Sequence, residues 1–162
     1  MMINIFMVNI FANDISKYDI DGIWEIPEEI EGQVSIGEII TQDEKSFAYA
    51  FAYTRRDGDK LIEREIRNEE SNAKDMVGKV FLSNLEFNGK KWINGRIYNP
   101  NNGNVYYAEA SLSPDKNVLA IRATIDSFGF IGVTLYWNRV KTPSYTPLSR
   151  NEIILIEALK EN

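Results

Sequence analysis

The feature that most constrains this chain is a series of four segments between residues 92 and 140 in which apolar and polar residues alternate. A period of two is typical of β-strands that bury one face, because successive side chains point to opposite sides of a strand. The short sequences between these segments are rich in Asn, Asp, Gly and Pro, which favour tight turns. We therefore predict a meander of four antiparallel strands, over residues 92–98, 105–112, 118–125 and 130–140.

In each of these segments the apolar side chains share one parity, which we predict to face the interior. The opposite parity carries polar side chains such as Asn94 and Thr134, as expected of a solvated face. The predicted interior residues are Ile93, Ile97, Tyr106, Ala108, Ala110, Leu112, Leu119, Ile121, Ala123, Ile125, Ile131, Val133, Leu135 and Trp137.

The first half of the chain contains four further segments of strand character, over residues 18–26, 34–40, 47–53 and 78–87. Together with the meander they bring the count to eight. Eight antiparallel strands can close an up-and-down barrel whose interior is filled by side chains or holds one small ligand. We therefore predict an all-β fold, a single eight-stranded antiparallel barrel, for which 162 residues are enough to enclose one core.

The strand over residues 47–53 bears on whether such a barrel is filled. Alanines alternate there with aromatic residues, in the order Phe47, Ala48, Tyr49, Ala50, Phe51, Ala52, Tyr53. Inward alanines would leave room for an apolar ligand, whereas inward aromatic rings would fill the barrel. Outward aromatic rings would form an apolar patch for another protein or a second copy of the chain. Both orientations remain open at this point.

Two segments depart from the strand pattern. Residues 55–75 are dense in charge, which favours a solvated loop over a short helix. Near the end, Ser149 and Glu152 have the spacing of a capping box ahead of an apolar stripe. We predict a C-terminal α-helix over about residues 150–160, packed on the outside of the barrel.

The N-terminal residues 1–12 are apolar apart from two asparagines. We treat residues 1–17 as an N-terminal extension or the remnant of a signal peptide, and residues 18–162 as the barrel domain. The expectation is export to the periplasm or beyond the cell, with a cytoplasmic location left open. No run of eighteen apolar residues occurs, so no transmembrane helix is expected.

Composition removes whole classes of chemistry. The chain contains no histidine and no cysteine, which excludes Ser-His-Asp triads, His-ligated zinc, thiolate nucleophiles and disulfides within it. A net charge of −6 disfavours nucleic acid as a partner, because binding a phosphate backbone depends on Lys and Arg. No cofactor is expected.

Carboxylates are the remaining candidates for chemistry. The acidic cluster Glu25, Glu28, Glu29 and Glu31 lacks the spacing of a calcium loop and is interpreted as a solvated strand end, with no metal expected. Glu109 is the one candidate acid on a well-defined strand, and its parity is outward. Arg96 and Arg122 flank it on neighbouring strands, which indicates cross-strand charge pairing more than a site for an anionic headgroup. We predict that the protein is not an enzyme, with a carboxylate-based hydrolase as the alternative.

Two short motifs resemble those of lipocalins: Gly22-Ile23-Trp24 near the start and Trp137-Asn138-Arg139 near the end. In lipocalins a Gly-x-Trp on the first strand meets a basic residue from the last strand at the closed end of the barrel. The resemblance implies a lipocalin-like barrel in which Trp24 and Arg139 form a structural closing pair, with a guanidinium over an indole face.

A further resemblance, from about Asp21 to Val140, is to the bacterial domain-of-unknown-function family 2147. It is carried by Trp92, Gly95-Arg96-Ile97-Tyr98-Asn99-Pro100, Gly103, Tyr106, Leu119, Ile121-Arg122, Gly129 to Gly132, Thr134 and Trp137-x-Arg139. It implies a lipocalin-like, usually exported protein without an established enzymatic activity. The chain departs from the family pattern in lacking two cysteines, in having Ala123 where glycine is common, and in the charged segment 55–75.

We therefore predict a non-catalytic protein that binds a small hydrophobic or lipid-like ligand in the barrel. The alternative is an interaction or structural module of the cell envelope with a filled barrel, acting as a homodimer or on another envelope protein. The predicted ligand-binding residues are Trp24, Ala50, Phe51, Ile97, Tyr106, Ala108, Ala110, Ile121, Val133 and Leu135.

Overall fold

The computed structural model describes residues 14–28, 32–57, 60–63, 76–141 and 145–160. Its elements are β1 (Gly22–Pro27), β2 (Gln33–Gln42), β3 (Lys45–Asp57), β4 (Lys60–Glu63), β5 (Lys79–Phe87), β6 (Trp92–Tyr98), β7 (Val105–Leu112), β8 (Val118–Thr124), β9 (Gly132–Arg139), the 3-10 helix η2 (Arg150–Glu152), β10 (Ile154–Leu155) and α1 (Glu157–Lys160). Among these described residues no helix is both long and apolar enough to cross a membrane.

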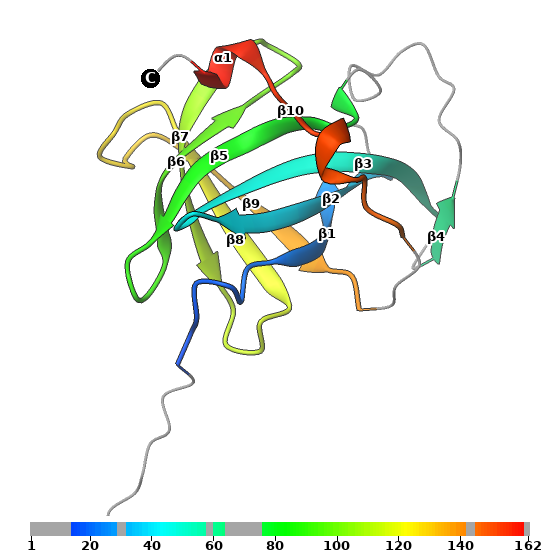
Figure 1. Ribbon diagram of the computed structural model, residues 1–162, viewed down its shortest axis with the longest axis horizontal. Helices are drawn as coiled ribbons and strands as arrows, with labels where there is room; N and C mark the ends of the chain where they lie inside the picture. The colour runs from blue at the N-terminus through cyan, green and yellow to red at the C-terminus, as the bar shows by residue number, and fades with distance from the viewer. Residues whose placement is uncertain (1–13, 29–31, 58–59, 64–75, 142–144, 161–162) are drawn as a thin grey trace, which may run out of the picture.

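Eight of the strands form a closed antiparallel barrel (Figure 1), which confirms the predicted fold. Neighbouring strands pair in the order β5, β6, β7, β8, β9, β1, β2 and β3, and β3 pairs back with β5 to close the ring. Closure satisfies the backbone groups that an open sheet would leave at its two edges. The two remaining strands are short additions: β4 extends β3 as a hairpin, and β10 pairs in parallel with the start of β5.

The barrel core is built mainly from the predicted interior parity. In β8, Leu119, Ile121 and Ala123 are buried, and Trp137 of β9 joins them. The prediction was wrong at Ile93. The pairing of β6 with β7 shifts between Trp92 and Gly95, where Asn94 has a positive φ of 62°, and Trp92 is the buried residue instead. An irregularity of this kind reverses the facing of every residue before it.

The structure also decides the orientation of β3. Ala48 and Ala50 are buried on the side of the barrel interior, and Ala48 belongs to the core cluster. Tyr49 points outward, yet it is 0% exposed, because the C-terminal segment covers this part of the sheet. Its hydroxyl donates a hydrogen bond to Glu38, which also pairs with Arg150 at 3.2 Å. Of the two orientations left open, the alanines face inward at Ala48 and Ala50, and the outward Tyr49 is covered by the chain itself; beyond a shift in register with β2, Tyr53 lines the cavity.

The C-terminal segment differs from the predicted helix over residues 150–160. The capping box of Ser149 and Glu152 forms, but it caps only the three-residue η2. The chain then extends, and β10 pairs with Lys79 and Val80 of β5. That edge is open because the pairing of β5 with β6 begins only at Leu82. The available strand edge and the β-branched isoleucines outweigh the helical pattern, which survives only in α1.

Two further boundaries were predicted incorrectly. Residues 18–21, expected as the start of the first strand, form a turn closed by hydrogen bonds such as that from Asp21 N to Tyr18 O at 3.0 Å. Part of the expected loop over residues 55–75 is strand, because β3 runs to Asp57 and β4 follows. The rest of that loop, and the apolar segment 1–12, lie outside the described residues.

Candidate functional site

One end of the barrel is closed by Trp24 and Arg139, in the contact that the resemblance to lipocalins implies. The guanidinium carbon of Arg139 lies 4.2 Å from the centroid of the Trp24 ring, which is 0% exposed. Register pairing of β1 with β9 places the two residues directly opposite each other. The guanidinium therefore stacks over the indole face in a cation–π contact.

The same guanidinium uses its donors on three backbone carbonyls. Arg139 Nε donates to Lys116 O at 2.7 Å, Nη1 to Asp21 O at 2.8 Å, and Nη2 to Asp19 O at 2.5 Å. A planar fork with donors in fixed directions can tie the N-terminal turn to the turn between β7 and β8, which a lysine cannot do. This closed end lies toward the bottom of Figure 1.

Gly22 leaves the space that the Arg139 guanidinium occupies. Its φ is +131°, a conformation that L side chains rarely adopt, and a Cβ there would lie 2.8 Å from Arg139 Nη1. The indole nitrogen of Trp24 donates to Ile20 O at 3.0 Å, so the turn before β1 is fixed from both sides. The Gly-x-Trp motif therefore has two roles at the closed end. Gly22 leaves room for the Arg139 guanidinium, and Trp24 hydrogen-bonds the preceding turn.

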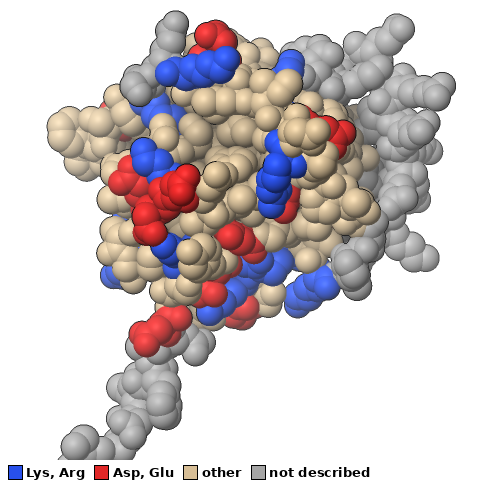
Figure 2. Space-filling view, viewed as in Figure 1, with Lys and Arg blue, Asp and Glu red and all other residues tan. Residues whose placement is uncertain are grey.

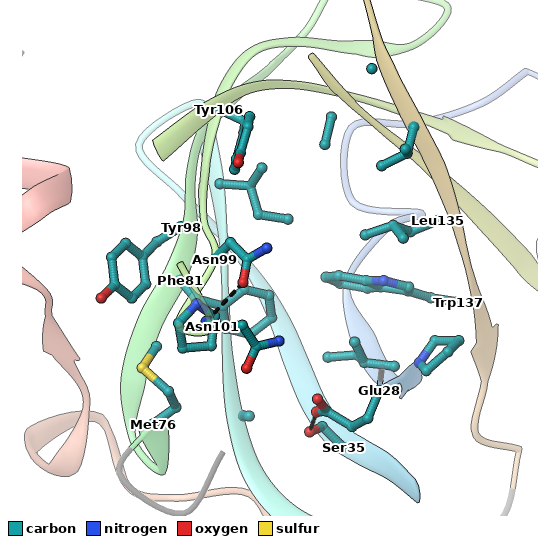
Figure 3. Close-up of a pocket in the computed structure, with 18 of the residues that line it drawn as sticks. Glu28, Ser35, Met76, Phe81, Tyr98, Asn99, Asn101, Tyr106, Leu135 and Trp137 are labelled. Atoms are coloured by element: carbon teal, nitrogen blue, oxygen red, sulfur yellow. Dashed lines mark hydrogen bonds between the residues drawn. The ribbon is translucent and has the colours of Figure 1, made fainter. Parts of the chain in front are cut away.

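The opposite end of the barrel contains a cavity of about 400 Å³ (Figure 3). This volume lies in the range of sites for small molecules, about 300–1,000 Å³. Most of its wall is apolar. The described residues that line it are Ile26, Pro27, Glu28, Ser35, Ala50, Tyr53, Met76, Phe81, Ile97, Tyr98, Asn99, Pro100, Asn101, Tyr106, Ala123, Ile125, Gly132, Val133, Leu135 and Trp137.

A small polar group interrupts the apolar wall. The Ser35 hydroxyl donates to Glu28 Oε1, and Tyr53 lines the same cavity. Burial, with the negative charge of Glu28, raises the pKa of the Tyr53 hydroxyl well above its ordinary value, so the group stays neutral at physiological pH. Figure 3 shows Glu28 and Ser35 together on one side of the cavity, near the Trp137 ring. We call Glu28, Ser35 and Tyr53 the acidic pole.

Two other polar features belong to the cavity. Trp137 is 1% exposed, and its indole nitrogen is among the buried side-chain atoms that have no hydrogen-bond partner within the described structure. At the rim, Asn101 N donates to Asn99 Oδ1 at 2.9 Å, which orders the turn between β6 and β7.

The predicted ligand-binding residues fall into three places. Ala50, Ile97, Tyr106, Val133 and Leu135 line the cavity. Trp24, Ala108, Ala110 and Ile121 are in the packed core instead. Phe51 is not among the lining residues, because its ring packs against Tyr49 and Tyr145 at centroid distances of 6.1 and 6.5 Å.

Sequence reasoning missed the acidic pole. Glu28 was interpreted as part of a solvated strand end, but it turns into the cavity beside Ser35, which is 3% exposed. Pro27 ends β1 just before it, and a strand end directed at the open mouth of a barrel is the signal that could have identified it. Within the described part of the chain no group of three or more Asp or Glu residues is placed to hold a metal ion.

Charged side chains on the outer surface of β6, β7 and β8 contact other groups of the protein. Glu109 forms an ion pair with Lys91 across the strands, whereas the Arg122 guanidinium, which is opposite it in register, donates to the carbonyls of Gly129 and Phe130 at 3.3 Å. Arg96 lies over the Tyr107 ring at 4.4 Å. Figure 2 shows Lys and Arg mixed with Asp and Glu over the face of the molecule seen there. Among the described residues, Arg96 and Arg122 therefore contact groups other than Glu109.

The turn between β8 and β9 protrudes from the barrel, as the gold loop in Figure 1 shows, and Ile125 and Gly132 at its two ends line the cavity. Phe128 and Phe130 at its tip are 82% and 81% exposed, and their rings stack at 6.3 Å. The Asp126 carboxylate accepts the backbone N–H groups of Phe130 at 3.0 Å and Ile131 at 2.7 Å. These hydrogen bonds hold the apolar tip in one conformation and lower the pKa of Asp126.

Known proteins agree with this architecture. A family model described as an uncharacterized protein conserved in bacteria (DUF2147) matches residues 15–139. Among solved structures, the chain is similar to protein HP1028 from the human pathogen Helicobacter pylori, which is described as belonging to the lipocalin family. The two share 23% sequence identity at a TM-score of 0.63, over 87% of this chain and 96% of that chain. No curated protein matches. This chain belongs to the bacterial DUF2147 family and has a lipocalin-like barrel fold.

Proposed function

We propose that this protein is a non-catalytic binding protein that holds one small, mostly apolar molecule in the open end of its barrel. The observation that carries the proposal is the cavity of about 400 Å³ with its largely apolar wall. The lipocalin-like fold is consistent with binding a small molecule. A concave apolar site with a few polar groups is the usual form of a small-molecule site.

The mouth of the cavity supports the same proposal. Val133 and Ile125 line it and remain 59% and 61% exposed, and Leu135 is 37% exposed. These residues have the interior parity of their strands, so their exposure comes from the open barrel end. An apolar molecule seated there would remove this surface from water, at about 25 cal/mol for each Å² covered.

The proposal assigns no catalytic step to the site. Glu28 is the one acidic or basic residue among the described residues that line the cavity. Carboxylate-based hydrolysis requires a second carboxyl group across the substrate, and the candidate Glu109 is on the outer surface in a pair with Lys91. Binding is therefore the function that this arrangement supports best.

The test is binding of the neutral apolar fluorophore N-phenyl-1-naphthylamine, followed by its fluorescence increase. We expect saturable binding with one site per chain. Ala123→Leu fills part of the cavity and should weaken binding about tenfold or more. The matched control is Ala120→Leu on the outward parity of the same strand, opposite Tyr136, which should bind as the wild type does. Absence of saturable binding by the folded wild type would contradict the proposal.

The protruding apolar tip favours a second candidate, self-association of the chain. Phe128 and Phe130 are the most exposed large apolar side chains among the described residues. A second copy covering both tips would bury them in a symmetric contact. Sedimentation velocity of the wild type and of the double variant Phe128→Ser, Phe130→Ser tests this candidate. A concentration-dependent dimer that the variant loses supports it, and a monomeric wild type contradicts it.

We also propose that the protein acts after export, as the apolar segment 1–12 led us to expect. Subcellular fractionation of cells that express the full chain and a version lacking residues 1–17 tests this location. Export that requires the segment supports the proposal, whereas an unchanged cytoplasmic location of both versions contradicts it.

A further inference from the structure

We infer that the apolar tip, formed by Phe128 and Phe130, inserts into the surface of a lipid bilayer with electrically neutral headgroups. The tip is a different surface from the cavity, so this contact does not depend on a bound ligand. Three features of the turn carry the inference: the exposure of its rings, the hydrogen bonding of its backbone, and its charges.

The two rings form a convex apolar surface. Phe128 is 82% exposed and Phe130 is 81% exposed, and Ile131, which follows them, is 61% exposed. The turn that carries them protrudes from the barrel (Figure 1), so the rings can leave water while the body of the barrel stays in it. Contiguous exposed apolar side chains mark a contact with another protein or with a membrane.

The backbone of the turn already has hydrogen bonds of the kind that entry into hydrocarbon requires. The Asp126 carboxylate accepts from the N–H groups of Phe130 at 3.0 Å and Ile131 at 2.7 Å. Arg122 Nη2 donates to the carbonyls of Gly129 and Phe130, both at 3.3 Å. Backbone groups in a bilayer core must find their partners within the protein, because no water is available there. Both backbone polar groups of Phe130 are therefore satisfied before the tip leaves water.

The charges of the turn favour neutral headgroups over anionic ones. Asp126 is the only acidic or basic residue in the sequence from Ile125 to Trp137. The Arg122 guanidinium, which reaches the turn, is engaged with its carbonyls. Attraction to anionic lipids depends on clusters of Lys and Arg, and the chain has a net charge of −6. Insertion of the tip therefore depends on burial of its rings alone.

A second copy of the chain is the competing occupant, and the available area distinguishes it from a bilayer. With both rings about four-fifths exposed, the tip presents about 250–400 Å² of aromatic surface. A standard protein interface covers about 800 Å² on each partner. A dimer would have to recruit further surface beyond the rings, whereas a fluid bilayer receives them without a preformed pocket. The area therefore favours lipid.

The first experiment is co-sedimentation with vesicles of phosphatidylcholine. We expect the wild type to bind, and the double variant Phe128→Ser, Phe130→Ser to bind at least about tenfold more weakly. The matched control is the double variant Tyr18→Ser, Ile154→Ser, which removes side chains that are 56% and 61% exposed elsewhere on the barrel. This control should bind as the wild type does. Absence of wild-type binding, or equal binding by the wild type and the tip variant, would overturn the inference.

Phe128→Trp reports where the tip lies. The native Trp24, Trp92 and Trp137 are at most 1% exposed, so they give a background that the wild type measures. We expect the emission of the new indole to shift to the blue with vesicles and to be quenched by phosphatidylcholine brominated on its acyl chains. Tyr18→Trp, in the turn before β1, should remain unquenched. Equal quenching in the two variants would contradict insertion through the tip.

Two further measurements separate the lipid surface from its alternatives. Sedimentation velocity without vesicles tests the second copy: a dimer that the tip variant loses, with no vesicle binding by the wild type, would replace lipid by self-association. Stronger binding to vesicles that contain phosphatidylglycerol would contradict the choice of neutral headgroups. Thermal unfolding identifies any variant that loses its fold, and Phe128→Trp, which keeps an aromatic ring at the tip, decides the inference should the serine variant not fold.

Discussion

The two ends of the barrel treat polar groups in opposite ways. At the closed end, Arg139 donates to three backbone carbonyls and Trp24 donates to a fourth. At the open end, the indole nitrogen of Trp137 has no partner among the described residues, and the Glu28 carboxylate accepts from the Ser35 hydroxyl in the wall of a cavity. The same strands build both ends, so one sheet supplies a packed, hydrogen-bonded end and an end that encloses a cavity.

Burial follows the same division. Trp24, Trp92 and Ile20 near the closed end are each 0% exposed. Val133 has the same interior parity in β9 as Trp137, yet it is 59% exposed while Trp137 is 1% exposed. Along β9 the interior parity therefore runs from the core at Trp137, at the inner wall of the cavity, to the exposed cavity wall at Val133. The predictions that follow test whether stability resides in the closed end.

The largest effect is expected from Trp24→Ala. The substitution removes a fully buried ring and the support of Arg139, and should lower the free energy of unfolding by about 3–5 kcal/mol. Urea unfolding followed by circular dichroism measures the change. The counterpart at the open end is Leu135→Ala, which should cost about 1 kcal/mol because the side chain is 37% exposed. Equal losses in the two variants would break the comparison.

The second effect is that of Arg139→Lys, which keeps the charge and removes the planar fork. One ammonium cannot reach the three carbonyls that the guanidinium binds, so we expect a loss of about 2–3 kcal/mol in urea unfolding. Arg150→Lys is the matched control, because Arg150 is exposed and its ion pair within the described residues is with Glu38. Its loss should remain below about 0.5 kcal/mol.

The closed end could be predicted from sequence because its motifs have specific residue requirements. Gly22, Trp24 and Arg139 stand at positions whose roles follow from the resemblance to lipocalins, and the alternation in β7, β8 and β9 defined the strands between them. The parity failed where a single backbone irregularity intervened, as at Asn94. Pattern reasoning assumes a constant period, and a local bulge breaks that assumption.

The open end could not be predicted to the same extent. Both parities of β3 are apolar, so the direction of Ala50 depended on packing rather than on its own pattern. Glu28 belongs to an acidic cluster that is typical of solvated loops, and only the barrel geometry turns it inward. A cavity is a property of the distances between strands. The capping box at Ser149 is a further example, since an open edge of β5 decided how the chain continued.

A third effect sharpens the comparison at Gly22. Gly22→Ala should lower the free energy of unfolding by about 2 kcal/mol, because the added Cβ is both strained and within 2.8 Å of Arg139 Nη1. Gly103→Ala is the control. Gly103 also has a positive φ, but a Cβ there meets nothing within 4 Å, so only the backbone cost of about 1 kcal/mol remains. Equal losses of unfolding free energy in Gly22→Ala and Gly103→Ala would show that the contact with Arg139 does not contribute to the cost at Gly22.

The smallest effect concerns acid stability. Hydrogen bonds from the Ser113 hydroxyl, and from the side chain and backbone of Asn117, lower the pKa of Asp115 to about 2 from its ordinary 3.8. A carboxyl group with a lowered pKa in the fold contributes stability above about pH 4, and that contribution is lost as the pH falls toward 2. Asp115 orders the turn whose Lys116 carbonyl accepts from Arg139 Nε, so the closed end shares this dependence.

Asp115→Asn should therefore flatten the fall of the urea midpoint between pH 5 and pH 2 relative to the wild type, while lowering the midpoint at pH 7. Asp126→Asn makes the matched change in the apolar tip at the open end, where the carboxylate accepts the N–H groups of Phe130 and Ile131. The pKa of Asp126 is also lowered, so its variant should lose some stability at pH 7, but less than Asp115→Asn because that turn has no contact with the Arg139 guanidinium among the described hydrogen bonds. A larger loss for Asp126→Asn than for Asp115→Asn would mean that the open end also carries the stability of the barrel.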